Sequence, residues 1–280
     1  MEEGVCKPGL VVYDTIIDSL CKDTLDDDAL NLFSEMMSKG IAPNVITYTS
    51  LIHGVCILGE WKEATSLVDG FCKVGRIDDA QKLFSEMQTC GQLPDARTYS
   101  ILLDGLCKNR QLSRAMQLFG EMEAKKLDID IVIYNILIEG LCIAGKIDSA
   151  RDFFCGLSSK GLRPDVRTYT IMINGLCIAG LTSEAEKFLI QMEEKGCSPD
   201  DCTYNTIIRG FIHNKQTSRA MVLIQTMVEK GFSADASTTE LIVNLLLKDE
   251  VDPALLPLIK KITEINMHLW TMKFGILQRP

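Results

Sequence analysis

The tyrosines of this chain are spaced almost regularly, and that spacing constrains its fold more than any other feature. The six are Tyr13, Tyr48, Tyr99, Tyr134, Tyr169 and Tyr204, so consecutive tyrosines lie 35 residues apart except at one gap of 51. Self-similarity at a fixed period of about 20–50 residues is typical of solenoids and other repeat arrays. We therefore expect a stack of 35-residue units rather than a domain built around one closed core.

Small residues recur at fixed places once tyrosine is taken as the fourth position of each unit. Position 20 is alanine throughout, and position 10 is glycine in nearly every unit. Such residues let helix backbones approach closely, where larger side chains would hold them apart. The regular units are residues 10–44, 96–130, 131–165, 166–200 and 201–235.

Each unit reads as two helices. The segment YNILIEGLCIAG, from Tyr134, shows the three-to-four spacing of apolar residues that is typical of a helix, and TSEAEKFLIQMEEKG, from Thr182, shows a second apolar stripe. A glycine then ends the second helix, and a proline usually follows three residues later. Neither helix can bury its apolar face alone, so we predict an all-α solenoid of stacked helix-turn-helix repeats.

Residues 45–95 depart from the regular pattern. Residues 45–67 match positions 1–23 of a unit and residues 68–95 match positions 8–35, so 19 residues are missing from what would be two repeats. We expect about three helices here, one of them fused near residues 60–72. We also expect the superhelix to kink or change register at this point.

The two ends of the sequence are irregular as well. Residues 1–9 resemble the end of a preceding repeat. Residues 236–263 begin as a further unit, but Thr239 replaces the tyrosine and the second half is shortened, which suits a capping repeat. Residues 264–280 match nothing earlier in the chain and are interpreted as a divergent tail.

The net charge argues against a protein that holds nucleic acid by bulk attraction. The chain has 29 Lys and Arg against 38 Asp and Glu, a formal charge of -9. Any nucleic-acid binding must therefore come from a local face. No segment is long and apolar enough to predict a membrane span.

Cysteine usage and the remaining motifs predict no catalytic or metal site. There is no CxxC pair and no signal peptide, and most of the cysteines fall at position 12 of the repeat, which suits a small buried residue in a reducing compartment. The three histidines have no partners at ligand spacing, and no phosphate-binding loop is present. We expect no cofactor, no metal and no enzymatic activity. The position-12 cysteines are Cys21, Cys56, Cys72, Cys107, Cys142 and Cys177.

Taken together, these columns resemble the P-type pentatricopeptide repeat. The unit VRTYTIMINGLCIAGLTSEAEKFLIQMEEKGCSPD carries the pattern, and DGFCKVGRIDDAQKLFSEM resembles the plant restorer-of-fertility branch. The resemblance covers residues 1–263. It implies a right-handed superhelix that binds single-stranded RNA along its first helices, one base per repeat, read by positions 5 and 35, with position 2 against the base.

The resemblance assigns these roles to particular residues. The reading pairs are Asp14 with Asn44, Ser100 with Asp130, Asn135 with Asp165, Thr170 with Asp200, and Asn205 with Asp235. The four pairs from residue 96 onward imply the sequence 5′-GUGU-3′, whereas Asp14 with Asn44 receives no base. The base-stacking residues are Arg97, Val132, Arg167 and Cys202, and the phosphate-contacting residues at position 13 are Lys22, Lys73 and Lys108.

Other interpretations stay open beside this one. An aspartate just before a helix often serves only as an N-cap, and a polar residue in a first turn is often only solvated. The chain could be a protein-binding helical scaffold, or a truncated remnant of the family with weak or no RNA binding. The family also implies protein partners in transcript processing and a mitochondrial location, with the chloroplast second, although the chain shows no Arg-rich presequence.

Overall fold

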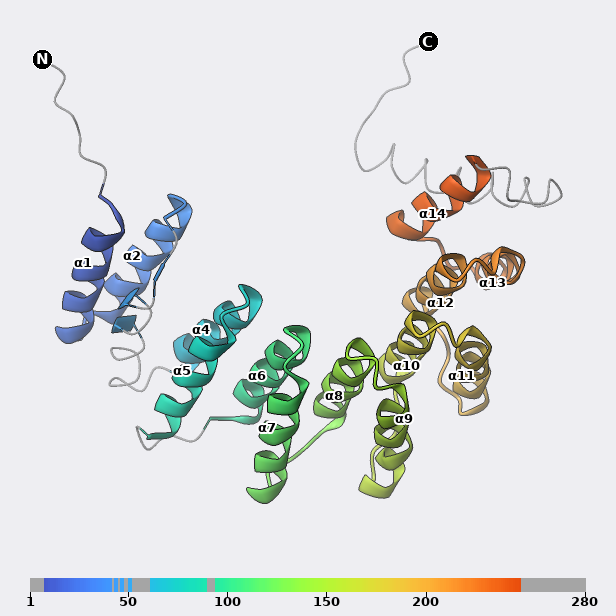
Figure 1. Cartoon of the computed structure of the whole chain (residues 1–280), viewed down its shortest axis with the longest axis horizontal. Coiled ribbons are helices and arrows are strands. Elements are labelled where there is room, and N and C mark those ends of the chain that lie inside the picture. Colours follow the sequence, from blue (N-terminus) through green and yellow to red (C-terminus); the bar gives the residue numbers. More distant parts are fainter. Residues whose placement is uncertain are drawn as a thin grey trace, which may run out of the picture. The chain divides into compact units, whose positions relative to one another are not determined.

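The computed structural model describes residues 8–41, 43, 44, 46, 47, 50, 51, 61–89 and 94–247. Within these residues every regular element is a helix (Figure 1). The chain divides into two compact units, residues 1–129 and 130–280, which are considered separately below. The first unit contains α1 (Leu10–Lys22), α2 (Asp26–Ser38), α4 (Trp61–Lys73), α5 (Ile77–Thr89), α6 (Ala96–Lys108) and α7 (Leu112–Ala124). The second contains α8 (Ile131–Ile143), α9 (Ile147–Gly156), the 3-10 helix η1 (Leu157–Lys160), α10 (Val166–Ile178), α11 (Thr182–Glu194), α12 (Asp201–His213), α13 (Thr217–Glu229) and α14 (Ala236–Leu247).

Helices alternate as first and second members of antiparallel hairpins. In the second unit α8, α10 and α12 contact one another in order and each pairs with the helix that follows it. An aspartate N-cap starts each of these three first helices. The predicted glycine stop follows the second helix, since Gly161, Gly196 and Gly231 all have positive φ. The predicted all-α repeat architecture is confirmed.

Two tyrosines of the column, Tyr13 and Tyr99, are buried and anchored by a lysine. Tyr99 is 1% exposed, and its hydroxyl accepts a hydrogen bond of 2.9 Å from Lys125 at position 30 of the same repeat. Tyr13 receives the same bond from Lys39 at 3.0 Å. In these two repeats the tyrosine therefore ties the start of the first helix to the end of its own second helix.

The glycine and cysteine columns meet at the contact between consecutive first helices. A Cβ atom added to Gly175 would lie 2.2 Å from Sγ of Cys142, and one added to Gly210 would lie 2.4 Å from Sγ of Cys177. No side chain fits at these distances, so glycine at position 10 allows the cysteine of the preceding repeat to pack against the helix backbone. We call this recurring contact the Gly–Cys contact. It accounts for the glycine and the cysteine at these positions.

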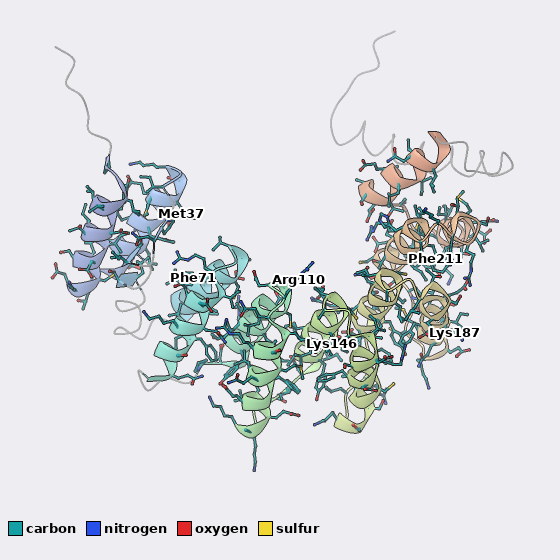
Figure 2. All side chains as sticks on the ribbon, viewed as in Figure 1. Met37, Phe71, Arg110, Lys146, Lys187 and Phe211 are labelled. Carbon is teal, nitrogen blue, oxygen red and sulfur yellow. The ribbon has the colours of Figure 1, made fainter. Side chains whose placement is uncertain are left out.

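The irregular region contains a helix of ordinary length. Residues 46, 47, 50 and 51 are helical, and α4 and α5 follow. α4 has 13 residues, as α6 and α10 do, and contacts α5 and α6. Phe71 on α4 and Phe211 on α12 both stand at the eleventh place of their helices and are fully buried (Figure 2). The expected kink in the superhelix stays a prediction.

Parts of the sequence-based interpretation lie outside the described residues. They are the remnant at 1–7, the segments 52–60 and 90–93, the end of the capping repeat beyond residue 247, and the tail at 264–280. The start of the capping repeat is described and forms α14. None of the described helices combines the length and apolarity that crossing a bilayer requires.

Candidate functional site

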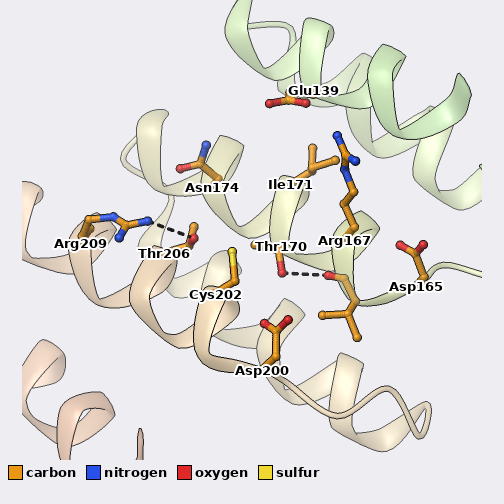
Figure 3. A pocket seen from close by; sticks show the side chains of 11 residues that line it. Glu139, Asp165, Arg167, Thr170, Ile171, Asn174, Asp200, Cys202, Thr206 and Arg209 are labelled. Atoms are coloured by element: carbon orange, nitrogen blue, oxygen red, sulfur yellow. Dashed lines mark hydrogen bonds between the residues drawn. The ribbon is translucent and has the colours of Figure 1, made fainter. Parts of the chain in front are cut away.

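A hollow in the second unit lies along its first helices α8, α10 and α12. It encloses about 560 Å³ and is open on one side (Figure 3). Both members of the predicted pair Thr170 and Asp200 line it, together with the position-2 residues Arg167 and Cys202. The remaining lining residues are Glu139, Asp165, Val166, Ile171, Asn174, Thr206 and Arg209.

A threonine joins Thr170 to Asp200. The hydroxyls of Thr170 and Thr203 lie 2.8 Å apart, and Oδ1 of Asp200 accepts hydrogen bonds of 2.8 Å from both the hydroxyl and the backbone N–H of Thr203. Thr170 also donates to the carbonyl of Val166 at 2.8 Å. Oδ2 of Asp200 accepts no hydrogen bond among the described residues, so an acceptor remains available in the hollow.

Asn135 and Asp165 form a pair with an unused acceptor. Nδ2 of Asn135 lies 3.5 Å from Oδ1 of Asp165, at the outer limit of a hydrogen bond. The Asn135 side chain is only 2% exposed, and its Oδ1 atom has no hydrogen-bond partner within the described residues. Buried polar atoms are nearly always paired, so this amide stands out as a group that a ligand or a side-chain rotation would satisfy.

Asp165 carries a stable negative charge beside Asn135. Burial opposes that charge, but hydrogen bonds from the backbone and hydroxyl of Thr168 and from the amide of Asn135 outweigh it, with Arg167 adding attraction. The pKa of Asp165 therefore lies below its ordinary value. The carboxylate is charged at neutral pH and acts only as an acceptor.

Asn205 and Asp235 form a pair whose polar atoms are already occupied. Nδ2 of Asn205 donates to the carbonyls of Asp201 (2.8 Å) and Ser233 (3.1 Å), and Oδ1 accepts from the backbone N–H of Asp235 at 2.9 Å. Arg209 binds Oδ2 of Asp235 at 2.5 Å, while Thr238 donates its N–H to Oδ1. Both members of this pair are held by the protein itself.

In the first unit, Asp14 and Asn44 bind each other. Nδ2 of Asn44 donates to Oδ2 of Asp14 at 2.7 Å, and the hydroxyl of Thr47 hydrogen-bonds Oδ1 of the same carboxylate. Asp14 is 6% exposed. This pair is thus brought together but enclosed, which gives a physical reason for assigning it no base.

The pair Ser100 and Asp130 is divided between the two units, so each residue is described alone. The hydroxyl of Ser100 donates to the carbonyl of Ala96 at 2.8 Å. Asp130 caps α8 by accepting from the backbone N–H groups of Val132 (3.0 Å) and Ile133 (3.2 Å). Of the other position-2 residues, Val132 is 44% exposed and Arg97 is exposed.

The N-cap interpretation of the position-35 aspartates is correct but does not use the whole group. Asp95, Asp165 and Asp200 each cap the next first helix through Oδ1. A carboxylate has two oxygens that can each accept hydrogen bonds. Capping by one oxygen fixes the orientation of the group and leaves Oδ2 for another partner, so capping and recognition are compatible.

The three position-13 lysines are each paired with an acid one turn earlier. Lys22 lies 2.6 Å from Asp18, Lys73 lies 2.5 Å from Asp69, and Lys108 lies 2.7 Å from Asp104. All three lysines are exposed. Exposed ion pairs of this kind contribute little to stability, so an RNA phosphate could replace the acid as the partner of the lysine. Until then the acid neutralises the charge of the lysine.

Sequence reasoning missed the residues that connect the predicted ones. The threonine at position 3 links positions 5 and 35, and its spacing of three from the aspartate is a recognisable capping signal. The position-9 acids were visible as i,i+4 partners of lysine. No sequence signal marked Arg209 as a partner of Asp235, because the two residues lie far apart in the sequence, at positions 9 and 35 of the repeat. The position-3 threonines in the second unit are Thr168, Thr203 and Thr238.

The described residues contain no group of His, Cys, Asp and Glu that could hold a metal ion. Burial raises the pKa of Cys142 and of Cys177 to about 12. Both thiols are therefore protonated at neutral pH and are poor nucleophiles and metal ligands.

Comparison with known families gives matches along most of the chain. The model described as PPR repeat family matches residues 8–57, 64–108 and 129–178. The model described as pentatricopeptide repeat domain matches residues 154–214, and the PPR repeat matches residues 97–127 and 202–232. A pentatricopeptide repeat-containing protein of Arabidopsis thaliana is 36% identical over 62 residues, which are 22% of this chain and 12% of that relative.

Solved structures share the architecture. The pentatricopeptide repeat protein PPR10, in complex with an 18-nt psaJ RNA element, superposes with a TM-score of 0.64 at 25% identity, over 92% of this chain and 41% of PPR10. PPR10 from maize without RNA gives a TM-score of 0.59 at 23% identity, over 96% of this chain and 41% of that one. The PPR domain of Arabidopsis protein-only RNase P 1, in complex with tRNA, gives 0.51 at 19% identity, over 64% of this chain and 94% of that domain, a likeness of fold alone. The chain thus spans under half the length of PPR10.

Proposed function

The chain belongs to the pentatricopeptide repeat family, and we propose that it binds single-stranded RNA along its first helices. The observation that carries the proposal is the hollow around Thr170 and Asp200. It presents a fixed hydroxyl and a free carboxylate oxygen between two exposed position-2 side chains. The likeness to PPR10, which was solved with an RNA element, supports the same class of ligand.

The chemistry of the hollow suits an unpaired base. The planar guanidinium of Arg167 can stack on a base face. The Asp200 carboxylate can accept hydrogen bonds from ring or exocyclic N–H groups, and the Thr170 hydroxyl can donate or accept. Unpaired bases are the elements of RNA that proteins read in this way, because their edges are not occupied by a complementary strand.

We further propose that residues 96–235 read one base per repeat, with the preference 5′-GUGU-3′. The family code carries this assignment, and the geometry of the second unit is compatible with it. Restorer-of-fertility-like action on organellar transcripts, by processing, stabilisation or translation, is the cellular role we propose. The location would be mitochondrial, or alternatively chloroplastic, with protein partners in transcript processing and no catalysis by this chain.

Magnitudes indicate modest affinity for four repeats. Each well-read base contributes about 1–3 kcal/mol, whereas association itself costs on the order of 4–15 kcal/mol. Four modules therefore leave little net free energy. Binding should weaken further with salt as far as phosphate contacts contribute.

The test is a fluorescence anisotropy panel with the full chain at low salt. Labelled RNA that contains GUGU should bind more tightly than scrambled RNA and than duplex DNA of the same length. Asn135→Thr should move the preference at the second base from U towards G and leave the other three bases unchanged. Equal binding to all RNAs, with no change in the variant, would contradict the code. Failure to bind any RNA while a protein partner co-purifies would favour a helical scaffold instead.

A further inference from the structure

Residues 61–95 combine pieces of two repeats, yet they have the layout of one complete repeat. By sequence, residues 61–67 match positions 17–23, which belong to a second helix. In the structure these residues instead begin α4, which contacts α6 as α10 contacts α12. Thr65 consequently stands fifth in α4, the place that Thr170 occupies in α10.

The hydrogen bonds around Thr65 match those around Thr170. The hydroxyls of Thr65 and Thr98 lie 3.0 Å apart, against 2.8 Å for Thr170 and Thr203. Thr98 donates its hydroxyl (2.7 Å) and its backbone N–H (2.8 Å) to Oδ1 of Asp95. Thr203 donates the same two groups to Oδ1 of Asp200, both at 2.8 Å. The two sites share residue types, spacing and bonding.

The packing beneath the two sites also matches. A Cβ atom added to Gly105 would lie 2.3 Å from Sγ of Cys72, so α4 makes the Gly–Cys contact with α6. The amide of Asn109 donates to the carbonyls of Cys72 (3.2 Å) and Gly105 (2.8 Å). Asn214 makes the corresponding pair of bonds, both 2.8 Å, between α10 and α12. The helix whose first seven residues match a second helix is therefore seated as a first helix.

The charge at the new site is also in place. Burial opposes ionisation of Asp95, but hydrogen bonds from the backbone and hydroxyl of Thr98 outweigh it, with attraction from Arg97, so the pKa of this carboxyl lies below its ordinary value. Both hydrogen bonds from Thr98 go to Oδ1 of Asp95, so Oδ2 receives neither of them. The exposed Arg97 beside it can provide a stacking face. One difference is that Thr65 is 9% exposed, whereas Thr170 is half-buried.

We propose that Thr65 and Asp95 form an additional base-reading pair, which takes the same base as Thr170 and Asp200. This inference rests on the proposed function. It makes the run of reading pairs continuous from residue 61 to residue 235. The recognised sequence becomes one nucleotide longer at its 5′ end, 5′-GGUGU-3′, and the 51-residue gap removes one pair from the array instead of two.

The experiment varies the base X in labelled 5′-XGUGU-3′ RNA, flanked by the same filler, and measures the dissociation constant of the full chain. The RNA with G at X should bind about 5- to 100-fold more tightly than those with other bases. Thr65→Asn should move the preference at X from G to U. The matched variant Thr170→Asn should do the same only at the base that Thr170 reads, the third of GUGU.

The outcomes separate the two proposals. A shift caused by Thr170→Asn together with indifference to X overturns the additional pair and leaves the proposed function intact. Indifference at both bases overturns both. If Thr65→Asn lowers the melting temperature enough to unfold the chain, Asp95→Asn decides instead, since asparagine keeps the N-cap. That variant should abolish the preference at X, and retention of the preference would overturn the pair.

Discussion

Two pairs of the second unit have the same residues and opposite bonding. Both pairs, Asn135 with Asp165 and Asn205 with Asp235, have asparagine at position 5 and aspartate at position 35. Asn135 leaves a buried acceptor unpaired, whereas Asn205 uses both ends of its amide and Asp235 binds Arg209. A base at the first pair could gain a hydrogen bond without breaking one. At the second pair a base must first displace hydrogen bonds within the protein. We infer that two pairs with identical residues can differ in how well they bind a base.

The largest effect should come from breaking the contact that holds α8 against α10. In Gly175→Ala the new methyl group would meet Sγ of Cys142 at 2.2 Å, so the helices must separate. Overpacking of this kind costs typically about 1–3 kcal/mol, and we expect a loss near the upper end in the free energy of unfolding measured with urea. The Asn135 pair should loosen with it.

Gly156→Ala is the matched control for that experiment. Gly156 has helical φ and ψ, and a Cβ atom there meets nothing within 4 Å. Alanine should therefore be neutral or stabilise by about 0.5–1 kcal/mol. Equal destabilisation by both variants would show that the Gly–Cys contact is not the cause.

The next effect tests the bonding difference directly. Asn205→Ala removes an amide that satisfies the carbonyls of Asp201 and Ser233 and the N–H of Asp235, so it should lower the free energy of unfolding by about 1–3 kcal/mol. Asn135→Ala removes one weak bond and an unpaired atom and should cost clearly less. Parallel urea titrations measure both, and a larger loss in Asn135→Ala would reverse the comparison.

A smaller effect concerns the ion pair between Arg209 and Asp235. Arg209→Met removes the guanidinium from Oδ2 of Asp235 and keeps much of the apolar stem. We expect the preference for U over C at the fourth base of GUGU to rise by up to about fivefold, since one charged hydrogen bond no longer has to be displaced. The readout is the ratio of dissociation constants for the two RNAs, because loss of a cation lowers the affinity for both. An unchanged ratio would mean that the ion pair between Arg209 and Asp235 does not compete with RNA.

The smallest effect is a pH dependence at Asp165. Because its folded pKa is lowered, its ionised form stabilises the fold above the unfolded value of about 3.9, and that contribution disappears as pH falls further. Asp165→Asn keeps the cap and removes the charge. We expect this variant to lose slightly in the free energy of unfolding at pH 7, and we expect the loss to fade below about pH 4. Urea unfolding at several pH values measures it. A loss that is constant with pH would assign the effect to geometry alone.

Local and periodic features were predictable from the sequence, whereas contacts between side chains far apart in the sequence were not. The 35-residue period, the glycine stops and the Asp caps follow from spacing and capping chemistry, and the structure has the predicted helical repeats. Which hydrogen-bonding atoms of a reading pair are already occupied depends on a third group, such as Arg209 for Asp235. Thr65 was missed because its segment matches a second helix in sequence, whereas in the structure it lies in α4, which contacts α6 as a first helix does.

The Gly–Cys contact has a consequence for how such arrays change over evolutionary time. The joint uses one cysteine on a helix and one glycine on the next. Cys72 and Gly105 meet as Cys142 and Gly175 do, even though the start of α4 matches a different part of the repeat. An array shortened within a repeat, as in residues 45–95, can therefore still have a properly seated junction, here between α4 and α6, so that the genetic unit of exchange need not coincide with the structural repeat.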